Sequence, residues 1–225
     1  MPLEVSSAVQ DYAKAIYSLE QRHEGGAVST NAIAERLGVS AASASSMVKK
    51  LNGLGLVQHV PYRGVALTER GAKVALEVLR HHRLLERYLA EELGVPWDRV
   101  HDEAEVLEHV LSEELEELIA AKLGHPTIDP HGDPIPTRDL EIVEADTVAM
   151  DELRTGDSGR LVRVSDSDPE MLRYLSARGI APGARFTVID KQPFGGPIFA
   201  CFDSSSDIHP LGGRLAAAMR VEVTS

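Results

Sequence analysis

The sequence of 225 residues has little of several residue types, and each shortage excludes a class of protein. Its single cysteine, Cys201, excludes an intrachain disulfide framework and a zinc site built from several thiolates. No apolar run is long enough to cross a membrane, and Met1–Glu4 lack the basic and then apolar pattern of a secretion signal. Aromatic residues make up only 4% of the chain, so we expect aliphatic cores. Together these shortages predict a cytoplasmic protein.

The charged residues are distributed unevenly. A net charge of −12 argues against nucleic acid as a partner, but the first third of the chain is basic. From Ser40 to Leu85 the acidic residues are Glu69 and Glu77, and the basic ones are Lys49, Lys50, Arg63, Arg70, Lys73, Arg80 and Arg83. Carboxylates then dominate from Glu86 to Asp146. This distribution predicts an anionic polymer as partner of the first part and cations as ligands of the second.

The N-terminal pattern predicts a helix-turn-helix. Apolar residues recur at helical spacing in Val9–Glu20. Ser29 can cap a short helix that ends near Leu37, and after a turn at Gly38 a second helix is expected over residues 41–52. The second helix of such a pair can enter the major groove of DNA. Its expected DNA-facing residues are small, hydroxyl-bearing or basic: Ser40, Ala42, Ser43, Ser46, Lys49 and Lys50.

A β-hairpin is expected directly after this helix pair. Residues 55–60 and 65–67 read as strands, and Pro61–Gly64 as the turn between them, with Arg63 at its tip. A helix-turn-helix followed by such a hairpin is a winged helix, with Arg63 placed to reach a phosphate or the minor groove. A protein-interaction module of the same shape is the alternative.

The middle of the chain carries candidate metal ligands. A long helix is expected from Thr68 to about Leu93, and His82 and Glu86 interrupt its apolar face at i and i+4. If His101–Val110 is helical, its polar residues share one face: His101, Glu105, Glu108 and His109. Carboxylates this close repel unless a cation lies between them, and oxygen with imidazole suits a hard or borderline divalent metal. The alternative is a solvated acidic face beside an ordinary His–Glu hydrogen-bonded pair.

Three further segments complete the chain. An apolar stripe forms either a homodimer interface or a structural core: Val110, Leu111, Leu115, Leu118 and Ile119. Residues 125–139 are a proline-rich loop, in which Asp129, His131 and Asp133 are either ligands or exposed polar residues. A small β-barrel is expected over the last residues, from strands 158–164, 184–190, 198–202 and 219–223 and a helix over 169–178.

Spaced motifs along nearly the whole chain resemble the diphtheria toxin repressor family of metal-dependent transcriptional repressors, in its manganese-responsive branch. They are PYRGVALT at Pro61–Thr68, HRLLE at His82–Glu86, VHDEAEVLEH at Val100–His109 and PHGDPIP at Pro130–Pro136. The resemblance implies a mainly α fold with a small β part. Its expected domains are a winged helix-turn-helix DNA-binding domain (1–73), a helical metal-binding and dimerisation domain with linker (74–140), and a C-terminal SH3-like β-barrel (146–225), similar to ferrous-transport accessory proteins.

The resemblance also implies a primary metal site made of Asp11, Glu105, Glu108 and His109. Iron-responsive members carry methionine at the position of Asp11 and cysteine at that of Glu105. Carboxylates in place of soft sulfur shift preference toward Mn(II), with Fe(II) second, because Mn(II) gains most from anionic oxygen.

An ancillary site is implied at His82, Glu86 and His101, although His82 belongs to the primary site in some manganese-type members. Iron-responsive relatives complete this site with two residues of the barrel, which align here with Arg163 and Asp166, so only Asp166 can serve. Linker residues His131 and Asp129 are the alternative ligands. Lys14 stands where a two-metal bacterial manganese regulator has glutamate, which argues against a closely spaced binuclear site.

The expected function is that of a cytoplasmic homodimeric repressor in metal homeostasis. It would bind a palindromic double-stranded DNA operator of metal-uptake genes when loaded with Mn(II) or Fe(II). One alternative is a winged-helix regulator that senses a small molecule and holds a structural His/Glu cluster. A di-metal carboxylate enzyme is disfavoured, because it would need a second Glu-x-x-His pair. We therefore expect no enzymatic activity.

Overall fold

The computed structural model describes residues 5–22, 26–60, 62–203 and 207–224. Pro61, in the expected wing turn, and Met1–Glu4 lie outside the described residues. The chain divides into two compact units. The first comprises residues 1–82, 108–111 and 136–141, and the second residues 83–107, 112–135 and 142–225. None of the described helices is long and apolar enough to cross a membrane.

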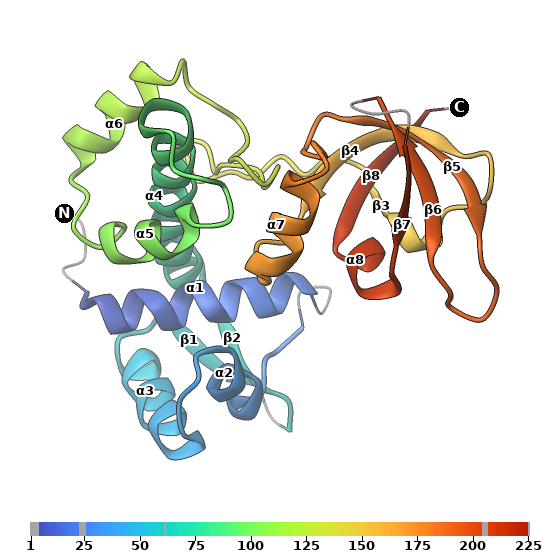
Figure 1. Cartoon of the computed structure of the whole chain (residues 1–225). Helices are drawn as coiled ribbons and strands as arrows, with labels where there is room; N and C mark the ends of the chain where they lie inside the picture. The colour runs from blue at the N-terminus through green and yellow to red at the C-terminus, as the bar shows by residue number, and fades with distance from the viewer. Residues whose placement is uncertain (1–4, 23–25, 61, 204–206, 225) are drawn as a thin grey trace. The chain divides into compact units, whose positions relative to one another are not determined.

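The first unit contains the expected winged helix (Figure 1). Its elements are α1 (Ser7–Arg22), α2 (Thr30–Arg36), α3 (Ala41–Gly53), β1 (Val57–Val60), β2 (Gly64–Leu67) and the start of α4 (Glu69–Leu93). Both expected serine caps are present: the Ser29 hydroxyl oxygen accepts from the Ala32 amide, and that of Ser40 from the Ser43 amide. Each cap satisfies an amide that has no partner within its own helix.

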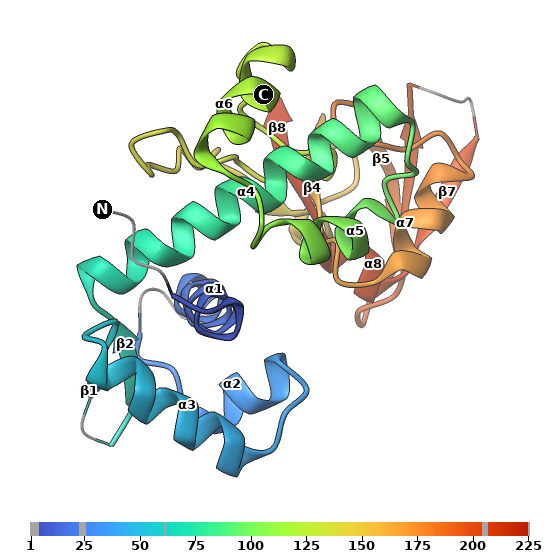
Figure 2. The same ribbon diagram turned by 90° about the vertical axis from the view of Figure 1, so that its left-hand side faces the viewer.

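An aliphatic core joins these elements, as the scarcity of aromatic residues predicts. Ile16, Ile33, Leu51 and Leu56 are fully buried in it, and α3 lies beside the hairpin (Figure 2). The wing also depends on Gly64, whose φ is +121°. A β-carbon at this position would lie 2.0 Å from the carbonyl oxygen of Val28, so no larger residue fits there without moving the wing.

The second unit contains the remaining part of α4 together with α5 (Val100–Leu107), α6 (Glu113–Lys122) and a C-terminal sheet domain. Six strands form the sheet in the order β3-β8-β4-β5-β6-β7, and every pairing is antiparallel. The strands are β3 (Val148–Ala149), β4 (Ser158–Val164), β5 (Arg185–Lys191), β6 (Ile198–Phe202), β7 (Ile208–Leu211) and β8 (Met219–Thr224). The accompanying helices are η1 (Met150–Glu152), α7 (Pro169–Ser176) and α8 (Gly213–Ala217). The sequence pattern did not predict β3, β7, η1 or α8.

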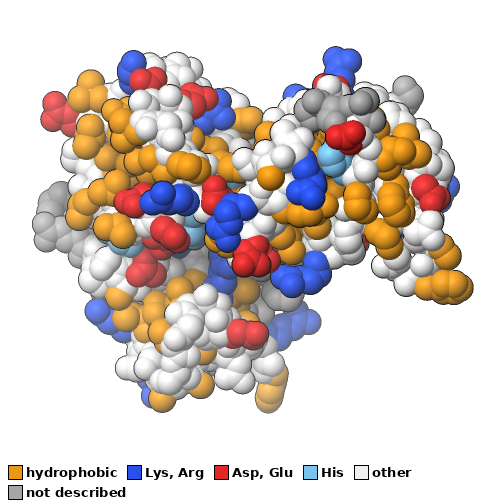
Figure 3. Space-filling model, viewed as in Figure 1, with side chains coloured by type: hydrophobic (Ala, Val, Ile, Leu, Met, Phe, Trp, Pro, Cys, Tyr) orange, Lys and Arg blue, Asp and Glu red, His pale blue; other side chains and the backbone are white. Residues whose placement is uncertain are grey.

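The apolar side chains of this domain follow strand alternation. Leu161, Ile198, Phe202 and Leu211 are buried on the inner face. Hydrophobic side chains also appear on the domain's surface (Figure 3). Phe194, between β5 and β6, is fully exposed. The expected α-rich chain with a small C-terminal β domain is confirmed.

Two local expectations are corrected. The acidic helix stops at Leu107, so Glu108 and His109 lie in a turn rather than on the helix with Glu105. The turn belongs to the first unit, where the Glu108 carbonyl oxygen lies 3.1 Å from Nδ1 of His81. The loop residues Asp129 and His131 are buried, so an exposed polar loop is the wrong interpretation of these two.

The apolar stripe after the acidic helix is largely exposed. Val110, Leu115 and Leu118 are exposed, Leu111 is half-buried, and Ile119 alone is buried. A structural core is therefore the wrong interpretation for the three exposed residues.

Candidate metal centres and nucleic-acid interface

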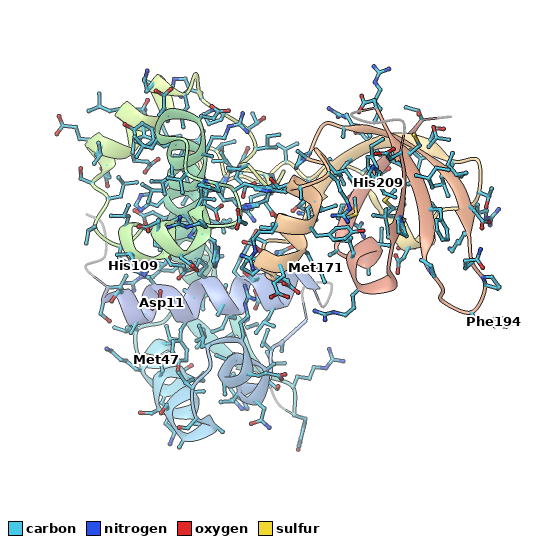
Figure 4. All side chains as sticks on the ribbon, in the orientation of Figure 1. Asp11, Met47, His109, Met171, Phe194 and His209 are labelled. Atoms are coloured by element: carbon cyan, nitrogen blue, oxygen red, sulfur yellow. The ribbon has the colours of Figure 1, made fainter. Side chains whose placement is uncertain are left out.

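The first candidate metal centre lies within the first unit and combines Asp11, Glu108 and His109. One ligand atom from each lies within 4.8 Å of the others. Nε2 of His109 is 2.8 Å from Oδ1 of Asp11 and 3.5 Å from Oε1 of Glu108. Asp11 on α1 and His109 in the turn after α5 point toward one another (Figure 4). The fourth expected ligand, Glu105, belongs to the second unit.

Glu108 is the buried anion of this centre, with no solvent exposure of its side chain. Its Oε1 lies 2.6 Å from Nζ of Lys14, and its Oε2 lies 2.5 Å from Nδ1 of His82. A buried carboxylate is costly unless it is paired and hydrogen-bonded, and these two contacts meet that need. His82 thus contacts a residue of the expected primary site. This contact favours the interpretation in which His82 belongs to the primary rather than the ancillary site.

Gln10 orients the imidazole of His109. The Gln10 side-chain oxygen lies 2.7 Å from Nδ1 of His109, where it can accept a hydrogen bond. That bond selects the tautomer in which Nε2 has a free lone pair, which is the form that binds metal. Gln10 was not predicted, since nothing in its sequence context distinguishes it from other polar helix residues.

This donor set fits a divalent metal. Two carboxylates and one neutral imidazole supply two negative charges and hard or borderline ligand atoms, which suit Mn(II) and Fe(II). No thiolate or thioether is among the donors of this centre, which disfavours soft ions.

A second cluster lies within the second unit and centres on His101. Its Nδ1 is 3.4 Å from Oε1 of Glu86 and 3.3 Å from Oδ2 of Asp166, and its Nε2 is 3.8 Å from Oε1 of Glu105. Hydrogen bonds to Asp166 and then to Glu86 raise the pKa of His101 from 6.5 to about 10, although burial opposes the shift. The expected ancillary residues Glu86, His101 and Asp166 therefore lie together.

His131 extends this cluster from the linker. Its Nδ1 lies 3.8 Å from Oε2 of Glu86 and 3.9 Å from Oδ2 of Asp129. Its Nε2 is 2.7 Å from the Trp97 carbonyl oxygen, and the two rings stack 5.8 Å apart. Burial lowers the pKa of His131, but the carboxylates of Asp129 and Glu86 outweigh it and raise the value to about 11. Within the described structure, Nδ1 of His131 is buried without a hydrogen-bond partner, so a cation among these carboxylates would fit.

Arg163, where iron-type relatives place a ligand, makes ion pairs instead. Its guanidinium lies 3.2 Å from Oδ1 of Asp133 and 3.6 Å from Oε2 of Glu144. Arg83 of α4 also pairs with Asp133, at 3.3 Å. Asp133 is therefore engaged by two arginines, and it belongs to neither cluster of potential ligands.

The expected DNA-facing residues are all accessible. Ser40, Ala42, Ser43, Ser46, Lys49 and Lys50 are exposed on or beside α3, whereas Ala44 and Leu51 point into the core. Arg63 is exposed in the wing turn. Small residues flanked by lysines allow α3 to approach bases and phosphates closely.

A winged helix that shares one compact unit with a carboxylate–imidazole centre defines a class: DNA-binding transcriptional repressors controlled by a metal ion. Comparison with known proteins agrees. Residues 4–65 match the N-terminal DNA-binding domain of iron-dependent repressors, residues 68–137 their metal-binding and dimerisation domain, and residues 148–223 the FeoA domain.

Individual relatives cover most of the chain. The iron-dependent repressor IdeR of Mycobacterium tuberculosis strain H37Rv is 35% identical over 205 residues, covering 86% of this chain and 88% of the relative. The diphtheria toxin repressor of Corynebacterium glutamicum is 34% identical over 222 residues, covering 94% of each chain. Among solved structures, a manganese-dependent transcriptional repressor in complex with manganese is 43% identical, with a TM-score of 0.87, and 96% of this chain and 100% of that one are covered.

The chain therefore belongs to the iron-dependent repressor family, whose members here include iron- and manganese-dependent repressors. It carries the family's DNA-binding and dimerisation domains, so its partners are DNA and a second copy of itself. Its relatives are transcriptional repressors rather than enzymes, and Mn(II) and Fe(II) both fit as its metal.

The raised pKa of His101 gives the metal-free protein a defined pH dependence. A histidine whose pKa rises on folding stabilises the fold fully below its unfolded value, and this contribution is lost as pH rises through its folded value. With a shift from 6.5 to about 10, we expect the unfolding temperature in chelator to fall between pH 7 and 9.5. His101→Gln keeps a polar side chain and should flatten part of this slope. If the unfolding temperature changed equally with pH in both proteins, this pH dependence could not be attributed to His101.

Proposed function

We propose that this chain is a manganese-activated repressor of metal-uptake genes, acting in the cytoplasm as a homodimer on a palindromic operator, with Fe(II) as the second metal. The observation that carries the proposal is the Asp11–Glu108–His109 centre. It joins α1 of the winged helix to the turn that follows α5. The proposed domain limits are 1–73, 74–140 and 146–225.

The proposed ligands fall into two sets. Asp11, Glu105, Glu108 and His109 form the primary site, with His82 held against Glu108. The ancillary site takes Glu86, His101 and Asp166, with His131 and Asp129 from the linker. Two observations support the second set: the short distances around His101, and the buried Nδ1 of His131. His82 is assigned to the primary side because it lies 2.5 Å from Glu108.

Metal binding would act on the position of α1. Val9 and Ile16 of this helix are buried in the winged-helix core, so fixing Asp11 also constrains the DNA-reading part of the unit. Without metal, Glu108 is paired with the ammonium group of Lys14. A metal can shift this equilibrium only by binding the DNA-competent form more tightly, and a hundredfold difference is worth about 2.7 kcal/mol.

In a homodimer two recognition helices would then match successive major grooves, about 34 Å apart. The exposed apolar residues Val110, Leu115 and Leu118 supply the proposed dimer contact. The exposed Ser40, Ala42, Ser43, Ser46, Lys49 and Lys50 of α3, with Arg63 of the wing, supply the proposed DNA contacts.

The proposal predicts DNA binding that depends on metal. Fluorescence anisotropy with a labelled fragment from the upstream region of the protein's own gene should show tight binding with Mn(II), and also with Fe(II) under anaerobic conditions. Binding should be lost in chelator. Salt must be fixed, because phosphate contacts make affinity strongly salt-dependent. Equal binding in chelator and in Mn(II) would instead favour the regulator of a small molecule with a structural His/Glu cluster.

A further inference from the structure

Lys14 lies directly on the buried carboxylate of the primary centre. Its Nζ is 2.6 Å from Oε1 of Glu108, and its side chain is only 16% exposed. The same oxygen lies 3.5 Å from Nε2 of His109, the nitrogen that faces Asp11. The ammonium group of Lys14 therefore contacts the same Glu108 oxygen that faces His109, another ligand group of the centre.

The placement follows from the helix. Lys14 comes three residues after Asp11 on α1, so the two side chains project from neighbouring positions on the same helix surface. The ammonium is thus delivered to the centre by the same helix that delivers its carboxylate ligand. A charge tethered in this way acts at a high effective concentration, and dissolved cations must compete with it.

We propose that Lys14 is a built-in competitor of the metal, which neutralises Glu108 in the metal-free protein and sets the metal concentration at which the centre fills. The inference rests on the proposed primary site. A divalent ion that binds Glu108 must displace the ammonium from Oε1 or share the carboxylate with it. Either course weakens binding, because a like charge is held within a few ångströms in a partly buried site.

The competition has a signature that a merely structural lysine would lack. Lys14→Met keeps most of the apolar stem and removes the charge. In the metal-free protein the buried Glu108 then loses the ammonium group that pairs with it, so the unfolding temperature should fall. The metal meets no competing charge, so its affinity should rise. If Lys14 were needed only for folding, its replacement would lower both the unfolding temperature and the metal affinity.

The test uses the full-length protein freed of metal. Mn(II) is titrated against a fluorescent metal indicator, and thermal unfolding is followed in chelator. The primary centre is identified as the Mn(II) binding that Glu108→Gln removes. Lys14→Met should bind Mn(II) at this centre about tenfold more tightly than the wild type and unfold at a lower temperature in chelator. Lys14→Arg, which keeps the charge, should resemble the wild type in affinity.

Lys73→Met is the matched control, because Lys73 pairs with Glu69 at 2.8 Å on an exposed part of α4. It should change neither quantity. Unchanged or weaker Mn(II) affinity in Lys14→Met, with a Glu108-dependent site present in the wild type, would overturn the inference and leave the proposed function standing. Absence of any Glu108-dependent Mn(II) binding in the wild type would overturn both.

Discussion

Replacing Asp11 with alanine is expected to abolish metal-activated DNA binding and to leave the chain folded and dimeric. Asp11 supplies one of the two carboxylates of the centre, and its oxygen lies 2.8 Å from Nε2 of His109. Its side chain is 37% exposed, so its removal should cost little folding free energy. Losing an anionic ligand should weaken Mn(II) binding by about a hundredfold or more, since interactions with a buried metal are poorly replaced by water. Anisotropy with and without Mn(II) measures the loss.

Two variants make this result specific. Asp102→Ala removes an exposed carboxylate of α5 that lies in neither cluster of potential ligands, and it should keep full activation. Glu105→Ala tests the proposed fourth ligand, whose side chain belongs to the second unit. Circular dichroism and size-exclusion chromatography report whether each variant is folded and dimeric. Full Mn(II) activation of both Asp11→Ala and Glu105→Ala would refute the proposed primary site.

The winged helix could be predicted because its determinants are local. Ser29 and Ser40 cap helices within three residues of themselves, and the hairpin strands are adjacent in the sequence. Strand β3, in contrast, has only two residues, which is too few to show alternation. Strand β7 contains Pro210, and a proline within a short segment argues against a strand. Their pairing comes from the rest of the sheet.

The sequence predicted the residue types that come together at the centre, but not the backbone conformation that brings them together. The i, i+3, i+4 spacing of Glu105, Glu108 and His109 is equally compatible with a continuous helix, yet the helix ends before Glu108. The residues that pair with Glu108 are distant in the sequence: Lys14 is 94 residues away and His82 is 26 residues away. Such contacts are tertiary, so no local pattern reveals them.

The linker shows the same limit. Its proline-rich sequence is typical of an exposed loop, yet His131 is fully buried and stacks on Trp97, 34 residues earlier in the chain. The residue types alone left His131 and Asp129 open as either ligands or exposed polar residues, and the resemblance to manganese-type repressors named them as alternative ligands. Residues of a functional site often break the local rules in this way, because their surroundings compensate for the cost of burial.

Exchanging two oxygen ligands for sulfur should shift the metal preference of the primary centre. In Asp11→Met combined with Glu105→Cys, soft donors replace two carboxylates. Mn(II) loses more than Fe(II) does, because its binding depends most on anionic oxygen. We expect the ratio of Fe(II) to Mn(II) affinity to rise by about tenfold or more, and activation to broaden toward softer ions. Competition titrations and DNA anisotropy, both anaerobic and in reductant, measure the two effects.

The matched control is Asp11→Asn with Glu105→Gln, which removes the same two charges and keeps oxygen donors. It should weaken both metals with a much smaller change in their ratio, so that loss of charge is separated from donor softness. Fe(II) remains the intrinsically tighter ion in every variant, since the affinity of a given site rises from Mn(II) to Fe(II). The informative quantity is therefore the ratio within each protein. An equal ratio of Fe(II) to Mn(II) affinity in the sulfur variant and the wild type would show that donor softness at residues 11 and 105 does not set the metal preference. Coordination geometry and the supply of metal would then have to determine it.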